Sequence, residues 1–497
     1  MGFYFSKSKY CLLWQCPKQV WLYKYRPELK KTDPAVEARM TAGQEVGELA
    51  KSYFGPYTDV SVVNEDGSLD LDEMLAKTQI LVDMGEENIC EASFCYDGLY
   101  CAVDILHHEN GGYAIYEVKS STHEAEIYGV DIAYQKYVLE HCGVKVTGTY
   151  LICIDSDYVR GEELDIHKLF KKVDMKEWVA LEYPNVRDRL VMGEQIMESE
   201  VEPECDMGAH CAHPYDCAYW DYCSRNLPKN NVFDLYVTRK PALKHYEKGV
   251  ISFVDALLSG GLGDRQKRQI NHTLTDCGNE IDKDGIRKFL STLSYPIYFL
   301  DFETMQQVVP QYPGATPYAQ IPFQYSLHYI EAPGGELKHK EFLAESGTDP
   351  RRAIAESLCK DIPMHTCVTA YNQKFERGRL NELALLFPDL ADHLLNIRNN
   401  IKDLLDPFQN GYYYNRAMGC SFSIKSVLPA LFPDDPELDY HNLEGIHNGT
   451  EAMNVFPKLK DMDSTEATKA RQNLLAYCKL DTYAMVKVWL KLCEVGK

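Results

Sequence analysis

The stretch FCYDGLYCAVDILHHENGGYAIYEVK, residues 94–119, decides the fold of the first part of the chain. Two runs rich in β-forming residues flank a turn at 110–112, which is the pattern of a hairpin. A helical pattern precedes the hairpin at 33–54, another follows it at 127–143, and the strand-like VTGTYLICI comes next at 146–154. This order of helix, strands, helix and strand predicts an α/β fold.

Three residues of this hairpin suggest chemistry. Glu117 and Lys119 lie two apart on one strand, so both side chains point to the same face of the sheet while Val118 enters the core. Asp104 lies on the preceding strand. Two carboxylates at a strand edge can hold Mg²⁺, and a neighbouring ammonium can orient water or offset charge on a phosphate. The set indicates phosphodiester hydrolysis, although Glu and Lys alternating on a solvated strand face is the commoner origin of such a pattern.

A second α/β pattern begins near residue 295. In the strand PIYFLDFET, Asp301 and Glu303 share one face, and Leu300 and Phe302 share the other. A strand-like CVTAYN and helical segments at 350–362 and 375–386 follow, and a long helix closes the chain. This half therefore predicts a separate α/β domain.

Further acidic residues of this half lie far along the chain. Glu376 comes just after the strand CVTAYN, and Tyr477 and Asp481 are four apart on the last predicted helix, so they share a face. Four acids from three elements are what a two-metal phosphodiesterase needs, and the tyrosine hydroxyl can position water. Each piece alone is also a common surface pattern.

The cysteines form a third pattern. Cys211, Cys217 and Cys223 are separated by equal gaps of five residues, and Cys16 lies near the start in CPKQVWL. Seventeen cysteines without a secretory signal indicate thiols and metal ligands rather than disulfides. Thiolates bind iron–sulfur clusters and Zn²⁺ alike, but zinc sites usually contain closer pairs than these.

Two ligand sets are compatible with these cysteines. One set has Cys16 as the fourth ligand beside the evenly spaced three. The alternative is a local site in which Cys205 replaces Cys16 and His210 and His213 are spare ligands. In that case Cys16 is a buried thiol.

Composition and charge limit the classes of partner. The formal net charge of −22 argues against nucleic acid, because phosphate neutralisation requires Lys and Arg. The charge is segregated, however: residues 1–31 and 265–268 are basic and residues 64–91 acidic, which permits a basic groove on an acidic body. No apolar run reaches the length of a membrane span, and the N-terminus lacks a secretory core, so we expect a cytoplasmic protein without a membrane partner.

Residues 1 to about 225 resemble the RecB-like PD-(D/E)XK nucleases, in the iron–sulfur branch that includes CRISPR-associated and helicase-linked members. The resemblance implies Asp104, Glu117 and Lys119 as the active-site acid, acid and lysine, and a 4Fe-4S cluster on Cys16, Cys211, Cys217 and Cys223. Two features depart from the family. Glu45 or Glu48 stands where many members have a metal-binding His on the first helix, and either Asp131 or Gln135 takes the place of the motif Gln on the helix after the hairpin.

Residues 293–493 resemble the DEDD exonucleases of the DnaQ-like, RNase H-fold group, in the branch with a tyrosine. The resemblance implies metal ligands at Asp301, Glu303, Glu376 and Asp481, with Tyr477 positioning water. The middle acid is normally Asp, so Glu376 is a departure that adds a methylene. Lys425, in the segment GCSFSIKSVLPALFP, is a candidate phosphate contact, although a solvated lysine is the ordinary interpretation.

Together these patterns predict three parts: a PD-(D/E)XK nuclease domain at 1–225, a helical connector at 226–290, and a DnaQ-like 3′–5′ exonuclease domain at 291–497. Such a fusion is similar to an uncharacterised prokaryotic family. The predicted function is a dual nuclease dependent on Mg²⁺ or Mn²⁺ that acts on nucleic acid, DNA being favoured over RNA, in repair or defence beside a helicase or related protein. The alternatives are a binding or scaffold protein with weakened nuclease folds, and an RNA exonuclease that uses only the C-terminal domain.

Overall fold

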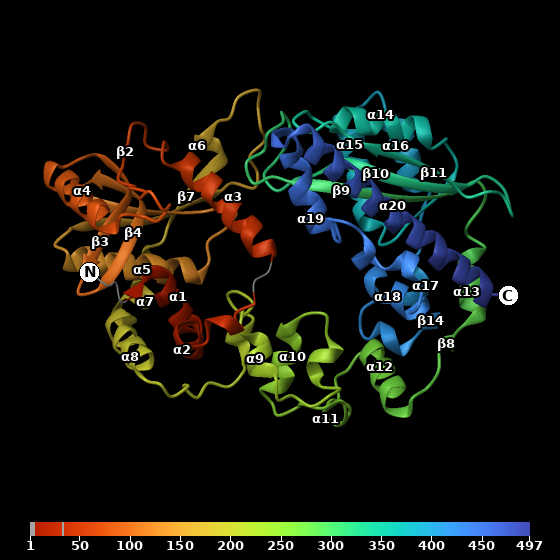
Figure 1. Cartoon of the computed structure of the whole chain (residues 1–497), viewed down its shortest axis with the longest axis horizontal. Coiled ribbons are helices and arrows are strands. Elements are labelled where there is room, and N and C mark those ends of the chain that lie inside the picture. Colours follow the sequence, from red (N-terminus) through yellow and green to blue (C-terminus); the bar gives the residue numbers. More distant parts are fainter. Residues whose placement is uncertain (1–4, 32–33) are drawn as a thin grey trace. The chain divides into compact units, whose positions relative to one another are not determined.

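The structure is a computed structural model that describes residues 5–31 and 34–497; Figure 1 labels its elements. It divides into two compact units, which are described separately. The first unit runs up to Leu227 and includes Tyr246–Lys248 and Gln307–Tyr318. The second contains Pro228–His245, Gly249–Gln306 and Ala319–Lys497. Each unit combines a sheet with covering helices, which confirms the predicted α/β class.

The first unit is built on one seven-stranded sheet. Its strands lie in the order β2 (Thr58–Asp59), β3 (Asn88–Tyr96), β4 (Leu99–Glu109), β5 (Gly112–Lys119), β6 (Val146–Ile154) and β7 (Phe170–Asp174), with β1 (Phe5–Ser6) beside β4. β3, β4 and β5 are antiparallel, and β5 and β6 are parallel. The predicted strand at 146–154 is confirmed as β6.

Two tight turns connect the antiparallel strands of this sheet. Asn110 (φ 55°) and Gly111 (φ 68°) form the predicted turn between β4 and β5, with the positive φ angles that a two-residue hairpin turn requires. Gly112, assigned to the turn from the sequence, instead begins β5. Asp97 and Gly98 form a second turn of the same kind, between β3 and β4. The Asp-Gly pair is the sequence signal that could have revealed it.

Helices cover both faces of the first sheet. The main ones are α1 (Lys7–Gln15), α2 (Pro17–Tyr25), α3 (Pro34–Ala50), α4 (Leu71–Met84), α5 (Glu126–His141), α7 (Lys176–Glu182) and α8 (Val186–Glu198). Side chains alternate between the two faces along β5. Ile115 therefore packs toward α1 and α5, whereas Tyr116 and Val118 pack toward α3. α3 confirms the helix predicted at 33–54 but ends earlier, and the first residue of that prediction, Asp33, lies outside the described residues.

The second unit contains a five-stranded mixed sheet. Its order is β11 (Lys338–Leu343), β10 (Gln320–Ile330), β9 (Ile297–Gln306), β12 (Cys367–Ala370) and β13 (Ile401–Asp403). β9, β12 and β13 are parallel to one another, and β10 is antiparallel to both β9 and β11. Central strand β9 carries Asp301 and Glu303.

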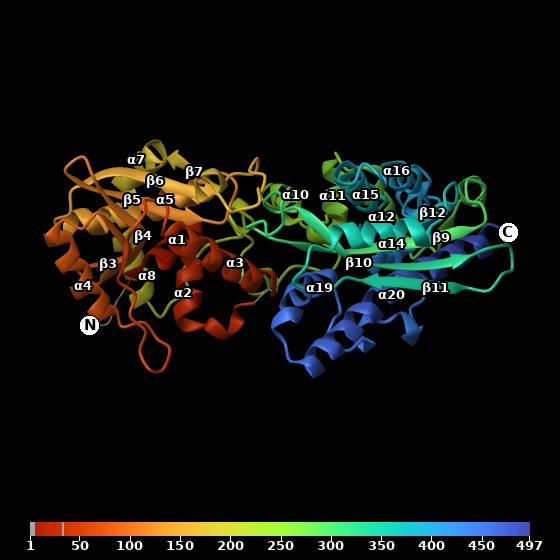
Figure 2. The same cartoon turned by 90° about the horizontal axis from the view of Figure 1, so that it is seen from above.

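Helices also cover both faces of the second sheet, as Figure 2 shows. α14 (Arg351–Asp361), α15 (Lys374–Leu386) and α16 (Ala391–Asn399) pack on the face that carries Leu300 and Phe302. α20 (Ser464–Val495) packs on the face that carries Ile297 and Phe299. Side chains two residues apart on a strand project from the same face. Asp301 and Glu303 therefore lie on the same face as Ile297 and Phe299, toward α20.

The segment predicted as a helical connector contains α10 (Arg239–Tyr246), α11 (Phe253–Ser259), α12 (Asp264–Thr275) and α13 (Lys283–Leu290). Most of it belongs to the second unit. A short strand within it, β8 (Glu280–Ile281), pairs with β14 (Tyr413–Tyr414). Among the helices of the described ranges, none is long and apolar enough to cross a membrane.

Candidate functional site

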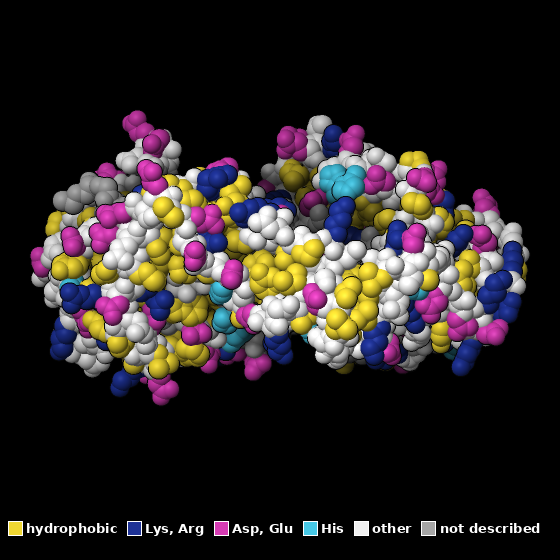
Figure 3. Space-filling view, turned by 90° about the horizontal axis from the view of Figure 1, so that it is seen from below, with side chains coloured by type: hydrophobic (Ala, Val, Ile, Leu, Met, Phe, Trp, Pro, Cys, Tyr) yellow, Lys and Arg dark blue, Asp and Glu magenta, His cyan; other side chains and the backbone are white. Residues whose placement is uncertain are grey.

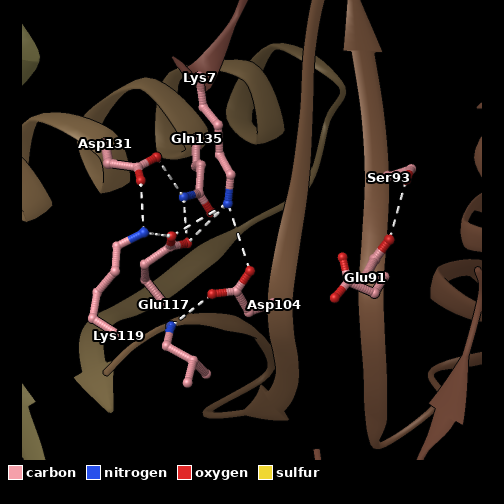
Figure 4. A network of polar contacts seen from close by, with 9 residues as sticks. Lys7, Glu91, Ser93, Asp104, Glu117, Lys119, Asp131 and Gln135 are labelled. Carbon is pink, nitrogen blue, oxygen red and sulfur yellow. Dashed lines mark hydrogen bonds and ion pairs between the residues drawn. The ribbon is translucent and has the colours of Figure 1, made fainter. Parts of the chain in front are cut away.

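The N-terminal acidic site lies on the face of β4 and β5 that α1 and α5 cover (Figure 4). Asp104 accepts a hydrogen bond of 2.7 Å from the backbone N–H of Val118, which fixes its carboxylate against β5. The ammonium of Lys119 lies 2.5 Å from Glu117 Oε1. The structure therefore brings the three hairpin residues selected from the sequence into one cluster.

Lys7, which the sequence did not single out, is also part of this site. It is the first residue of α1, and its Nζ lies 3.2 Å and 3.3 Å from the two carboxylate oxygens of Glu117. The same Nζ lies 3.6 Å from Asp104 Oδ1. Figure 4 shows the Lys7 side chain descending from its helix to a point between the two carboxylates. No periodicity signals this contact, because it joins residues more than 95 positions apart.

Helix α5 supplies two further polar groups to the same site. Gln135 Nε2 donates to Glu117 Oε2 at 2.7 Å and to Asp131 Oδ1 at 3.0 Å. Lys119 Nζ lies 3.3 Å from Asp131 Oδ2. The sequence left open whether Asp131 or Gln135 occupies the motif position; in the structure both contact the cluster.

The charges of this site interact strongly. Burial favours a neutral Glu117, but the ammonium groups of Lys119 and Lys7 outweigh it and hold its pKa well below the usual range. Burial and repulsion by Glu117 raise the pKa of Asp104 and of Asp131. Ionised Glu117 is thus the anion around which the two lysines gather.

The acids considered on the first helix behave differently from these. Glu48 is exposed and pairs with Lys51, and Glu45 is exposed as well. A better-placed additional carboxylate is Glu91 on β3, which no pattern in the sequence indicates. The pairing of β3 with β4 sets it opposite Asp104, and burial together with repulsion by Asp104 raises the pKa of Glu91 to about 7.

The donor set of the N-terminal acidic site fits a hard cation under one condition. The facing oxygens of Asp104 and Glu117 already converge on one positive group, the Lys7 ammonium. Mg²⁺ prefers oxygen ligands of this kind. Asp104 and Glu117 would have to hold a metal ion with oxygens that now contact Lys7, so its binding would require Lys7 to move aside.

The C-terminal acidic site is formed by β9, α15 and α20. One ligand atom each from Asp301, Glu303 and Cys478 lies within 4.8 Å of the others. Burial, repulsion by Asp481 and other nearby carboxylates raise the pKa of Asp301 well above the ordinary value, and burial with repulsion by Asp481 does the same for Glu303. β9 and α20 thus bring together acids that the sequence places 180 residues apart.

Two tyrosines contact the last acid of this site. Tyr440 donates to Asp481 Oδ1 at 2.6 Å, and Tyr477 also hydrogen-bonds to this carboxylate. Burial raises the pKa of Asp481 to about 6 although these bonds oppose the rise. Tyr477 was selected from the sequence, whereas Tyr440 was not, since it belongs to a segment without a periodic pattern.

Glu376 lies in the first turn of α15 and is almost fully buried, at 2% exposure. Its Oε2 has no hydrogen-bond partner within the part of the chain that the structure describes. Burial is the main cause that raises the pKa of Glu376 to about 8. An ionisable oxygen left without a donor in this position is a ready ligand for a cation.

The C-terminal acidic site therefore fits metal ions well. Of the described residues, none forms an ion pair with Asp301, Glu303, Glu376 or Asp481. Lys425, exposed on α18 (Ile424–Leu431), lowers the pKa of Glu303 and Asp481 from a distance but does not contact them. Glu303, Glu376 and Asp481 are buried and Asp301 is half-buried, so these carboxylates are costly to ionise without a paired cation. Divalent ions would relieve their repulsion.

A narrow cysteine cavity lies near the C-terminal end of α1. Its thiols come from both ligand sets considered from the sequence: Cys16, Cys205, Cys211, Cys217 and Cys223. Cys16 Sγ lies 3.7 Å from Cys205 Sγ, which in turn lies 3.7 Å from His210 Nε2. Ligand atoms of Cys16, Cys205 and His210 lie within 4.8 Å of one another and could hold a metal ion, and Cys211, Cys217 and Cys223 line the same cavity.

The surroundings of the cysteine cavity connect it to α1. Gln15, the last residue of that helix, donates to the carbonyls of His210 and Tyr215, both at 2.8 Å. His213 instead lies 3.7 Å from Glu126 and does not line the cavity. Of the two spare histidines considered, only His210 is placed to bind a metal ion.

Comparison with known proteins gives one match. Residues 298–423 match a family model described as a domain of unknown function, DUF2779. The matched region contains Asp301, Glu303 and Glu376 and ends before Tyr477 and Asp481. No curated protein and no solved structure matches the chain.

Proposed function

We propose that this chain is a metal-dependent nuclease with a RecB-like first unit and a DnaQ-like second unit. The observation that carries the proposal is the C-terminal acidic site, where Asp481, Glu303 and Glu376 all repel Asp301 and none of the four carboxylates has an ion-pair partner among the described residues. Such a set is stable in its ionised form only with bound cations. A paired-metal phosphodiesterase requires that arrangement.

Asp301, Glu303, Glu376 and Asp481 would hold Mg²⁺ or Mn²⁺, which when bound activates water and stabilises the leaving oxygen. The residues of the chain have their own tasks. Tyr477 and Tyr440 orient the Asp481 carboxylate through their hydroxyl groups. The pleat of β9 fixes Asp301 and Glu303 on the same face, and Lys425 supplies positive charge near them.

In the first unit, Asp104 and Glu117 would hold the cation and Lys119 would offset charge on the phosphate. Gln135 holds Glu117 in place by its hydrogen bond. The thiols of the cysteine cavity would hold a 4Fe-4S cluster or Zn²⁺ as a structural centre, with Cys16, Cys211, Cys217 and Cys223 as the preferred set. DNA is the favoured substrate.

A second candidate function has one observation in its favour. Because Lys7 lies between Asp104 and Glu117, the N-terminal acidic site already has a cation of its own. A first unit that binds nucleic acid or a partner without cutting would need no metal ion there. In that case only the second unit would be an enzyme.

The test uses protein purified without oxygen and incubated with Mg²⁺ or Mn²⁺ on single-stranded DNA, double-stranded DNA and RNA labelled at either end. We expect Asp301→Asn to abolish shortening from an end and Asp104→Asn to abolish any remaining cleavage. Glu382→Gln, an exposed change on α15, is the control and should retain full activity. If the wild-type protein cuts none of these substrates, the proposed nuclease activity is refuted.

A further inference from the structure

A basic cavity lies on α15 and α16, away from the carboxylates described above. Its volume is about 440 Å³, and it is lined by Gln373, Lys374, Arg377, Gly378, Asn381 and Arg398. None of these residues has a role in either acidic site. The feature is distinct in a chain whose formal net charge is −22.

Helical geometry explains how the cavity forms. Lys374, Arg377, Gly378 and Asn381 follow the spacing i, i+3, i+4, i+7, so they line up on one face of α15. Leu380 and Leu383 occupy the opposite face and enter the core. Arg398 comes from the last turn of α16, which packs beside α15. Gly378 leaves the middle open, since a Cβ there would meet no atom within 4 Å.

The cations of this cavity lack acidic partners. No carboxylate of the described residues lies within ion-pair distance of Lys374, Arg377 or Arg398, whereas Arg379 on the same helix pairs with Glu382. Elsewhere the chain mixes its charges, and Figure 3 shows Lys and Arg among Asp and Glu on the face drawn. Three unpaired cations around one cavity repel one another, and an anion between them would remove that repulsion.

The hydrogen-bonding groups of the cavity also have unused capacity. Arg377 donates one bond to Gln373 Oε1 at 3.2 Å, and Arg398 donates one to Asn399 Oδ1 at 3.1 Å. Arg398 Nε is buried and has no acceptor within the described part of the chain. Buried donors are nearly always paired, and the described residues supply no acceptor for this one.

The chemistry of these groups selects phosphate. Guanidinium groups match phosphate oxygens with two parallel hydrogen bonds. The side-chain amides of Gln373 and Asn381 both donate and accept, as contacts with a sugar or a base edge require. We propose that the basic cavity binds the sugar–phosphate backbone of a nucleic-acid strand, an inference that rests on the proposed function. Since Glu376 and Arg377 are consecutive on α15, the strand reaches the C-terminal acidic site across roughly one helix width, about 10 Å.

Binding is measured by fluorescence anisotropy of a labelled single-stranded oligonucleotide in EDTA, with Asp301→Asn as the background so that no cleavage occurs. Log affinity falls linearly with log salt concentration. For a single strand, every cation removed from the phosphates makes this fall shallower by about 0.7 in slope. Replacing Lys374, Arg377 and Arg398 together by Gln should therefore reduce the slope by about 2 and weaken binding at low salt at least tenfold. Unchanged affinity and slope would overturn the proposal.

Two further variants separate the cavity from general charge effects. Gly378→Leu changes no charge and is compatible with the open space at its Cβ, so it should fold and still weaken binding by filling the cavity. Arg379→Gln removes a cation of the same helix outside the cavity and should leave the slope unchanged. Equal weakening in Arg379→Gln and in the triple variant would contradict the assignment.

Competition distinguishes a strand from a free nucleotide, because both carry phosphate. If a mononucleotide or inorganic phosphate binds the cavity while binding of the oligonucleotide does not depend on the cavity, the strand assignment is wrong. The binding assay requires no catalysis. A dependence of oligonucleotide binding on the cavity in a protein that cuts nothing would therefore support this inference while refuting the proposed nuclease activity.

Discussion

Lys7 and Glu117 are 110 residues apart in the sequence, yet the Lys7 ammonium lies within 3.3 Å of both carboxylate oxygens of Glu117. Lys7 begins α1, and Cys16 caps the other end of that nine-residue helix. A helix of this length behaves as a short rod about 14 Å long. The N-terminal acidic site and the cysteine cavity are thereby joined by one element.

Replacing Lys7 by Met should strengthen divalent binding at the N-terminal acidic site. The ammonium and a metal ion compete for the same oxygens of Asp104 and Glu117, and removing one close charge is worth at least about 1.4 kcal/mol, or tenfold in affinity. Mn²⁺ binding, followed by electron paramagnetic resonance in an Asp301→Asn background, measures the effect. Lys9→Met, two residues along the same helix, is the matched control. Weaker Mn²⁺ binding in Lys7→Met would show that the lysine assists the metal instead.

Asp301→Asn should stabilise the metal-free protein while it removes activity. Burial and repulsion by its neighbours make ionised Asp301 unfavourable, so an amide of the same shape should raise the free energy of unfolding by about 1 kcal/mol in EDTA. With Mg²⁺ added, the wild type should become the more stable of the two proteins, because only the wild type gains fully from metal binding. Thermal unfolding with and without Mg²⁺ tests both statements. A lower melting temperature of the variant in EDTA would contradict them.

Two histidines on the second sheet, His328 buried and His339 half-buried, should make the second unit sensitive to acid. His328 Nδ1 lies 2.8 Å from Thr482 Oγ1, and His339 Nε2 lies 2.9 Å from Ser326 Oγ. Burial lowers the pKa of His328 to about 3 and that of His339 to about 4. Nearby Lys479 also lowers both pKa values. Glu341, 3.9 Å from His339, is the acidic neighbour of the pair.

The sign of the effect follows from these lowered values. The neutral histidines favour the folded state above the unfolded pKa of about 6.5, and this contribution is lost as the pH falls toward the folded values. Between pH 6.5 and 5 the loss is about 1.6 kcal/mol per histidine. Urea unfolding at pH 7 and pH 5 should show a smaller decrease for His328→Gln than for the wild type. Equal decreases would disprove the role of His328.

The cysteine cavity predicts different outcomes for two adjacent thiols. Cys16 is buried at 7% exposure, whereas Cys205 is more accessible. We expect Cys16→Ser to lose the bound metal. Cys205→Ser should retain it with an altered visible spectrum, because the Cys205 thiol lies beside the proposed ligand Cys16. Iron and zinc content with absorbance measures both, and Cys277→Ser, at an exposed cysteine, is the control. Loss of metal in Cys205→Ser alone would favour the local ligand set.

Much of the fold follows from periodicity in the sequence. The strand at 146–154 and helices α14 and α15 were predicted within one or two residues, since their apolar patterns are long and have clear ends. The turn at Asp97 and Gly98 was missed because a strong β pattern continues on both sides of it. Glu91 was missed for a related reason, since an acid inside an apolar strand resembles an ordinary exposed position.

The sequence by itself determined which side chains share a face, because strand and helix periods are local. It therefore paired Glu117 with Lys119 and Asp301 with Glu303. Only the tertiary structure brought Lys7 to Glu117 and Cys205 to Cys16, pairs separated by 110 and 189 residues. Such contacts depend on how whole elements pack, and local backbone preferences carry no information about that packing.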